Sequence, residues 1–237
     1  MPNLEKVISK KIGRAIFDYK MIKNKDKILI GVSGGKDSLT LLYDLIKRQK
    51  SFPIKYKIQA AHIITDFTIC NKEKIENIFN EWNVEYHFIN VPVLKRLKPG
   101  ENMNCYWCSS QRRIELAKVA IKTGCNKIAL GHHMDDVIET ILMNMFFNAK
   151  IAAMNPIMKY KKFPYSIIRP LVYIKEEQIK KFAKTKNFLN LVCNCPYGNN
   201  SKRLEIKHLV DQLCKNNKLI RENIFNSLKN ICKEYLT

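Results

Sequence analysis

The chain has 237 residues, which is enough to bury a substantial core in one large α/β domain with helical additions. Its 42 lysines and arginines outnumber its 21 aspartates and glutamates, and the net charge of +21 favours a polyanionic partner such as nucleic acid over a merely lysine-rich solvated surface. The sequence contains no window of about 18 apolar residues that could span a membrane, and its N-terminus lacks a signal-peptide pattern, so we expect a cytoplasmic protein. In that compartment we expect some of its eight cysteines to serve metal or redox chemistry rather than disulfides.

The first predicted element is an amphipathic helix over residues 4–18. Lysines occupy one face, and the other face carries apolar residues at helical spacing, namely Leu4, Val7, Ile8, Ile12, Ala15 and Ile16. We expect this helix to pack beside the main domain or to serve a homodimer.

Residues 28–46 combine a strand, a glycine loop and a helix. Residues 28–32 are an apolar run typical of a buried parallel strand, and apolar residues recur at helical spacing from Leu41 to Ile46. The loop between them reads Ser33-Gly34-Gly35-Lys36-Asp37-Ser38. It is not the common P-loop, which requires glycine at position 30 and a hydroxyl residue at position 37. Adjacent glycines let several backbone N–H groups point to one place at the positive end of the helix dipole, so the loop is predicted to bind phosphate.

The remaining elements alternate between strands and helices. Strands are predicted over residues 57–64, 84–89, 127–131 and 166–169, and helices over 71–82, 110–123, 134–147, 175–186, 201–216 and 220–236. This order predicts an α/β fold with a parallel twisted sheet of about five strands and helices on both faces. The first strand should be central, with a nucleotide bound at the carboxyl ends of the strands.

A second polar cluster follows the fourth strand, in the sequence GHHMDDVIET of residues 131–140. Because the carboxyl ends of parallel strands share one edge, we expect Gly131, His132, Asp135 and Asp136 to face the glycine loop. Imidazoles and carboxylates at this place can ligate Mg²⁺, contact the α-phosphate of a nucleotide or manage protons. A helix cap formed by the two aspartates and a zinc site are the alternatives.

The glycine loop resembles the PP-loop of ATP pyrophosphatases, which cleave ATP between the α and β phosphates. Further motifs accompany it: a CxxC of Cys105 and Cys108 followed by SxxRR, the GHHxDDxxET sequence, IRPL at residues 168–171 and a later cysteine in Asn194-Cys195-Pro196. This combination resembles the tRNA 2-thiocytidine synthetase branch of the PP-loop family over residues 25–210. On that basis the chain divides into an N-terminal helix (1–24), a PP-loop ATP pyrophosphatase domain (25–190) and a basic helical extension with the third cluster cysteine (191–237).

The resemblance implies a tRNA sulfurtransferase that uses ATP and Mg²⁺ to adenylate the C2 oxygen of an anticodon-loop cytidine, and then replaces that oxygen with sulfur. The implied partners are tRNA and a sulfide donor such as a cysteine desulfurase product. The implied nucleotide site comprises Ser33, Gly34, Gly35, Lys36, Asp37, Ser38, Asp66, Gly131 and His132. The implied catalytic residues are Lys36, Asp37, Asp135, Asp136 and Arg112.

Members of this branch deliver sulfide through a [4Fe-4S] cluster held by three cysteines, which leaves the fourth iron open. By position the ligands here are Cys105, Cys108 and either Cys193 or Cys195. Cys195 is favoured because Arg203 follows it at the family's spacing, although the family's usual C-x-x-C is shortened here to Cys193-Asn194-Cys195. Four thiolates from the two pairs would also suit a closed zinc site.

Three other functions are retained beside cytidine thiolation. The first is thiolation of uridine, and the second is cluster-dependent desulfuration of a thiolated base. The third, from another class, is a zinc-stabilised nucleotide- and RNA-binding module. A predicted basic surface for tRNA phosphates comprises Lys159, Lys161, Lys162, Lys180, Lys181, Lys184, Lys202 and Arg203. Tyr106 and Trp107 can stack a base or shield the cluster.

Overall fold

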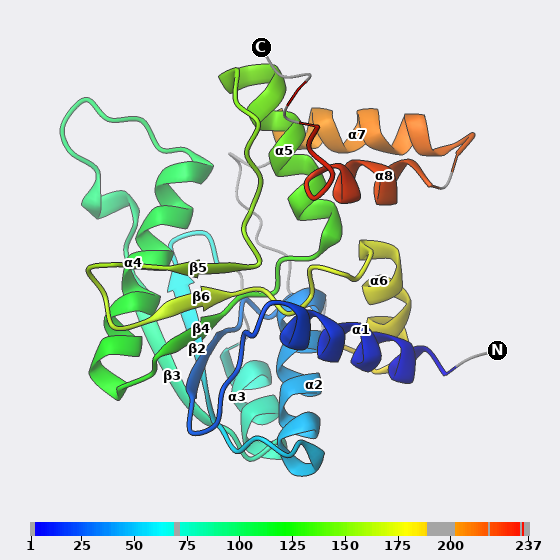
Figure 1. Cartoon of the computed structure of the whole chain (residues 1–237). Coiled ribbons are helices and arrows are strands. Elements are labelled where there is room, and N and C mark those ends of the chain that lie inside the picture. The colour runs from blue at the N-terminus through cyan, green and yellow to red at the C-terminus, as the bar shows by residue number, and fades with distance from the viewer. Residues whose placement is uncertain (1–2, 69–71, 189–201, 218, 233, 235–237) are drawn as a thin grey trace.

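A computed structural model describes residues 3–68, 72–188, 202–217, 219–232 and 234. Its centre is a six-stranded sheet in the order β3-β2-β1-β4-β6-β5 (Figure 1). The strands are β1 (Lys27–Gly31), β2 (Lys57–Thr65), β3 (Glu85–Val91), β4 (Lys127–Ala129), β5 (Ile157–Lys159) and β6 (Ser166–Ile168). All neighbours pair in parallel except β5 and β6, which are antiparallel. The predicted α/β fold with a central first strand is confirmed, since β1 lies between β2 and β4.

Helices cover both faces of this sheet. They are α1 (Leu4–Asp18), α2 (Lys36–Ser51), α3 (Lys72–Glu81), α4 (Cys105–Thr123), α5 (Met134–Asn148), α6 (Glu176–Thr185), α7 (Lys202–Cys214) and α8 (Ile220–Ser227), with a short 3₁₀ helix at Leu94–Arg96. One apolar cluster joins Leu29 and Ile167 of the sheet to Leu116 of α4. The larger cluster lies on the opposite face and includes side chains from α1, α2, α3 and α6. None of the described helices is long and apolar enough to cross a membrane.

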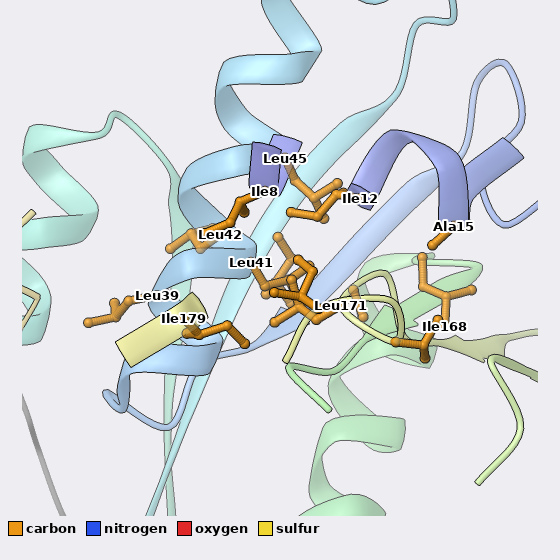
Figure 2. Close-up of a cluster of buried hydrophobic side chains, with 14 of the residues drawn as sticks. Ile8, Ile12, Ala15, Leu39, Leu41, Leu42, Leu45, Ile168, Leu171 and Ile179 are labelled. Carbon is orange, nitrogen blue, oxygen red and sulfur yellow. The ribbon is translucent and has the colours of Figure 1, made fainter. Parts of the chain in front are cut away.

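The N-terminal helix is part of the larger core, as the amphipathic pattern predicted. Ile8 and Ile12 of α1 pack with Leu42 and Leu45 of α2, and all four side chains are fully buried (Figure 2). Burial of such aliphatic side chains contributes about 1.5–3 kcal/mol each. The apolar face of α1 is therefore occupied within the chain itself.

The C-terminal helices α7 and α8 pack beside α5, above the edge of the sheet where the parallel strands end (Figure 1). Ile206 and Val210 of α7 and Phe225 of α8 belong to the same buried cluster as α1 and α2. The three predicted domain segments, divided at residues 24 and 190, thus contribute to one apolar core in the described residues.

Three elements differ most from the predictions. Strand β5 was not predicted, because a three-residue run carries no periodicity of its own and forms only by pairing with β6. Helix α4 begins at Cys105 rather than at residue 110, because the Asn104 side chain accepts a hydrogen bond from the Trp107 N–H at 2.8 Å and caps it there. Helix α8 ends at Ser227, well before residue 236.

Candidate functional site

The glycine loop joins the carboxyl end of β1 to the first turn of α2. Gly34 has a φ of 82°, a left-handed conformation that favours glycine, and Gly35 is the N-cap of α2. The Ser38 hydroxyl accepts the Ser33 N–H at 3.1 Å and donates to the Gly35 carbonyl at 3.0 Å. The loop is thus held in a fixed shape at the positive end of a helix dipole, which suits an anionic phosphate group.

The turn between β4 and α5 touches this loop through Gly131. A Cβ at residue 131 would stand 3.0 Å from the backbone carbon of Asp37 and 3.0 Å from the backbone nitrogen of Ser38. Only glycine permits that approach. The contact brings the polar cluster of residues 131–136 against the first turn of α2, as the sequence predicted.

Lys36 lies between two carboxylates at the start of α2. Its Nζ is 3.0 Å from Asp37 Oδ2 and 3.1 Å from Glu176 Oε1. Burial by itself lowers the pKa of Lys36, but the two carboxylates outweigh burial and raise the pKa above its ordinary value. The lysine is therefore a partly buried cation at the loop, ready to bind phosphate oxygens.

Asp37 also offers an unsatisfied oxygen. Its Oδ1 is buried and has no hydrogen-bond partner among the described residues. His133 Nε2 lies 3.7 Å from that oxygen. A buried carboxylate oxygen without a partner is costly, and a divalent cation beside the phosphates would satisfy it. Asp37 therefore fits the predicted role of holding Mg²⁺, although no group of three or more His, Cys, Asp or Glu side chains in the described residues is arranged as a metal site.

Glu176 was not singled out from the sequence, yet it is central to the charge balance of the site. It lies in the first turn of α6, and its Oε2 accepts from Lys207 Nζ at 2.8 Å and pairs with Lys180 Nζ at 3.1 Å. Burial alone would raise the pKa of Glu176, but hydrogen bonds from Lys207 and Lys180 and the charge of Lys36 hold it well below its ordinary value. A glutamate in the first turn of a helix is usually explained by its favourable interaction with the helix dipole, so the sequence near Glu176 did not indicate a role in the site.

Asp135 and Asp136 are engaged by protein groups. Asp135 accepts from the Glu176 N–H at 2.7 Å and from Arg221 Nε at 2.8 Å, so it links α5 to α6 and α8. Asp136 accepts from the His133 N–H at 2.8 Å and thereby caps α5. The helix-cap alternative describes Asp136, and the catalytic roles proposed for both aspartates stay predictions.

Glu139, one turn farther along α5, is a second group that sequence reasoning left without a role. Only 6% of its surface is exposed, and Arg203 Nε of α7 lies 3.3 Å from its Oε2. Burial raises the pKa of Glu139 to about 7, although the Arg203 charge opposes that shift. Arg203 was predicted to bind tRNA phosphates, but its guanidinium is directed at this carboxylate.

His132 stands at the carboxyl end of β4 and meets Arg169, which directly follows β6. Arg169 Nε donates to His132 Nδ1 at 3.2 Å, and the arginine is 6% exposed. Burial lowers the pKa of His132 to about 4, and the positive charge of Arg169 adds to that effect while Asp136 opposes it. His132 is therefore a neutral imidazole beside the loop.

The cysteine pair lies on the first turn of α4. Cys105 and Cys108 are three residues apart, which places them on one side of the helix. Because α4 runs antiparallel to the strands it connects, this turn lies at the same edge of the sheet as the glycine loop (Figure 1). Soft thiolates at this spacing fit an iron–sulfur cluster. The choice between Cys193 and Cys195 lies outside the described residues.

Two further predicted site residues flank this region. Asp66, at the end of β2, is exposed and accepts a hydrogen bond from the Leu94 N–H at 3.1 Å, which fixes the 3₁₀ helix. Arg112 is half-buried on α4. Burial lowers the pKa of His62 on β2, and the charge of Arg112 lowers it further, whereas the hydrogen bond between the His62 ring and the Val32 carbonyl raises it.

The two aromatic residues between the cysteines differ in their surroundings. Trp107 Nε1 donates to the Val93 carbonyl at 3.2 Å, whereas Tyr106 is 78% exposed.

Comparison with known proteins agrees with this geometry. A family model described as a PP-loop domain matches residues 4–213. The chain is 36% identical over 234 residues to a tRNA-cytidine(32) 2-sulfurtransferase of Geotalea uraniireducens, covering 97% of this chain and 93% of the relative. It is 34% identical to a protein of the same name in Geobacter sulfurreducens, covering 98% of this chain and 92% of the relative.

Two solved structures share the fold. The U34-tRNA thiolase NcsA from Methanococcus maripaludis with its [4Fe-4S] cluster has a TM-score of 0.78 at 25% identity, and the match covers 99% of this chain and 80% of that one. The NH3-dependent NAD synthetase from Campylobacter jejuni has a TM-score of 0.53 at 15% identity, covering 98% and 94%, and supports the fold alone.

The parallel sheet, the SGGKDS loop and the matched domain define an ATP-binding enzyme of the PP-loop class. Within that class, the chain belongs to the tRNA-cytidine(32) 2-sulfurtransferase family. The resemblance predicted from the motifs is thereby confirmed.

Proposed function

We propose that the chain thiolates cytidine 32 of tRNA, using ATP to activate the C2 oxygen and sulfide to replace it. The observation that carries the proposal is the meeting of three elements at one edge of the sheet. The glycine loop, the Gly131 turn and the Cys105–Cys108 turn are contributed by chain segments far apart in sequence. Family membership supplies the substrate named for the relatives, a cytidine at position 32.

The reaction needs one displacement at phosphorus and one at carbon. The C2 oxygen of the cytosine attacks the α-phosphorus, the bond to the β-phosphate breaks and pyrophosphate leaves. Sulfide then adds to C2, and AMP leaves with the original oxygen. Lys36 and the loop N–H groups hold the phosphates and stabilise the charge that develops on the leaving pyrophosphate. Asp37 would hold Mg²⁺, which supplies further charge neutralisation at the phosphates.

The sulfur side of the reaction belongs to the cysteines. Cys105, Cys108 and Cys195 would hold a [4Fe-4S] cluster, whose open iron supplies a place for exogenous sulfide. Cys105 is exposed, whereas Cys108 is partly exposed and packs against the smaller apolar cluster. Arg112, one turn beyond Cys108, would contact a phosphate or the activated base.

Exposed lysines of the predicted basic surface suit the phosphates of tRNA. Lys180 and Lys181 are paired with Glu176 and Glu177, and Arg203 with Glu139, so these three are less available than predicted. The other exposed lysines of the predicted basic surface are Lys159, Lys161, Lys162, Lys184 and Lys202, and Lys159 lies opposite Ser166, at the edge of the sheet away from the glycine loop. The sulfide donor and a homodimer remain parts of the same proposal.

The test begins with metal content. Protein purified without oxygen is expected to contain about four irons and four sulfides per chain and to show broad visible absorption. That protein, given ATP, Mg²⁺, sulfide and unmodified tRNA, is expected to form 2-thiocytidine at position 32 with one AMP released per sulfur inserted, as read by mass spectrometry of nuclease digests. One zinc without iron would overturn the proposal in favour of a zinc-stabilised RNA-binding module, and 2-thiouridine as the product would move the activity to another base.

A further inference from the structure

Arg169 is the buried cation of the site to which no role has been given. It follows β6 directly, and its backbone N–H donates to the Pro156 carbonyl at 2.9 Å. Its side chain makes two contacts at once, because Nη1 donates to the Asn155 carbonyl while Nε donates to His132 Nδ1 at 3.2 Å. The guanidinium is therefore fixed by the turn that precedes β5 and is aimed at one nitrogen of one imidazole.

That contact decides where the imidazole carries its proton. A guanidinium has only donors, so His132 Nδ1 must be the acceptor, and the single ring proton of the neutral imidazole must then lie on Nε2. The other groups that act on this ring are Asp136, which opposes the effect of Arg169 on the pKa of His132, and Arg203 and His133, which reinforce it. Burial and the two arginines keep the pKa of His132 low and the imidazole neutral, so Nε2–H remains a donor across the physiological pH range.

We propose that Arg169 is a positioning residue, which locks His132 in the tautomer whose Nε2–H donates to a phosphate oxygen of the bound nucleotide. This inference rests on the proposed function for the identity of the ligand, but the tautomer itself does not. Gly131 packs against the backbone of Asp37 and Ser38, so residue 132 is the first side chain beyond that contact with the phosphate-binding loop. A neutral donor there adds a hydrogen bond to the phosphate without a third positive charge beside Lys36 and Mg²⁺.

Arginine is required because one planar group must serve two acceptors in different directions. Nε reaches the imidazole and Nη1 reaches the Asn155 carbonyl in the same plane, whereas a lysine ammonium is a single flexible point of charge. An Arg169→Lys variant should therefore hold His132 in the Nε2–H tautomer only in part, and Arg169→Met should not hold it there.

The first test reads the tautomer directly, in protein without nucleotide. Long-range proton–nitrogen NMR of histidine-labelled protein at pH 7.5, with the His132 signals assigned by their loss in His132→Gln, is expected to show an unprotonated Nδ1 and a protonated Nε2. Arg169→Met is expected to convert this to a mixture of tautomers, while Arg14→Met, at an exposed helical position, is not. A protonated Nδ1 in the wild type, or an unchanged tautomer in Arg169→Met, would overturn the assignment. Neither result depends on whether the enzyme thiolates tRNA.

The second test asks whether Nε2–H meets the nucleotide. The probe is an ATP analogue with a methylene group between the α and β phosphates, with binding measured by calorimetry. The amide nitrogen of Gln can stand near Nε2, whereas that of Asn stands near Nδ1. We therefore expect His132→Asn and Arg169→Met to weaken binding by about tenfold or more, and His132→Gln to weaken it much less.

Melting temperatures identify a variant that has simply unfolded, and both variants at position 132 keep Arg169 itself unchanged. Equal losses in His132→Gln and His132→Asn would show that shape rather than the Nε2–H donor matters, and would overturn the proposed contact with phosphate.

Discussion

Lys36 of the phosphate-binding loop forms an ion pair with Glu176 of α6, with 3.1 Å between Nζ and Oε1. A phosphate must therefore compete with this carboxylate for the lysine. Since Glu176 also binds Lys207 and Lys180, the pair ties the nucleotide loop to α6 and α7.

We expect Glu176→Gln to bind ATP more tightly than the wild type, by roughly two- to fivefold, because an ion pair that competes for Lys36 is removed. The measurement is the dissociation constant of the methylene analogue of ATP. Glu177→Gln is the matched control, because Glu177 is the neighbouring carboxylate and pairs with Lys181 on the exposed side of the helix. Weaker binding in Glu176→Gln alone would mean that the carboxylate orients Lys36 toward phosphate rather than competing for it.

Gly131→Ala is expected to damage the nucleotide site. The added methyl group would stand 3.0 Å from backbone atoms of Asp37 and Ser38, and backbone cannot move aside as a flexible side chain can. Overpacking of this kind costs about 1–3 kcal/mol. Both the melting temperature and ATP affinity should fall. In Gly13→Ala, by contrast, the new methyl group meets only the end of the Arg48 side chain, so ATP affinity should not change.

Glu139 should make stability depend on pH. Its folded-state pKa is raised to about 7 from an ordinary value of 4.5, so the folded chain retains a proton that the unfolded chain releases between those values. The contribution of this group to the free energy of unfolding is therefore fully present below about pH 4.5 and is lost as pH rises toward 7.

Glu139→Gln should accordingly gain more stability relative to the wild type at pH 8 than at pH 5, as measured by urea unfolding. Glu205→Gln, on an exposed face of α7, provides the control. A difference between Glu139→Gln and the wild type that is the same at both pH values would refute the predicted protonation of Glu139.

The cluster ligands can be separated by single substitutions. After anaerobic purification, iron is expected to be absent from Cys105→Ser, Cys108→Ser and Cys195→Ser and present in Cys193→Ser. Cys232→Ser removes an exposed thiol of the C-terminal segment and serves as a control that should also retain iron. Loss of iron in Cys193→Ser but not in Cys195→Ser would reverse the choice of third ligand.

Local patterns predicted the parts of this molecule that depend on local rules. The strand, glycine loop and helix around Lys36 follow from apolar periodicity and from glycine conformations, and the approach of residues 131–136 follows from the shared edge of parallel strands. The amphipathic pattern of α1 likewise predicted that its apolar face is buried.

The sequence did not reveal the pairings between distant charges. Glu176 and Glu139 look like ordinary helix residues, because nothing near them in sequence indicates that Lys36 and Arg203 will meet them. The same holds for Arg169, which was noted only as part of a motif. Its partner His132 becomes evident only when β4 and β6 lie side by side.

The carboxylates of α5 and α6 take their counter-charges from the end of the chain. Asp135 is met by Arg221, Glu139 by Arg203 and Glu176 by Lys207. During synthesis on a ribosome, a nascent chain translated only as far as α6 contains every strand and the glycine loop, yet Asp135 and Glu139 still lack these cations and Glu176 has only Lys36 and Lys180. The charge balance of the nucleotide site is therefore completed last, when α7 and α8 have left the exit tunnel, and an interrupted translation product would lack both these cations and the core side chains of α7 and α8.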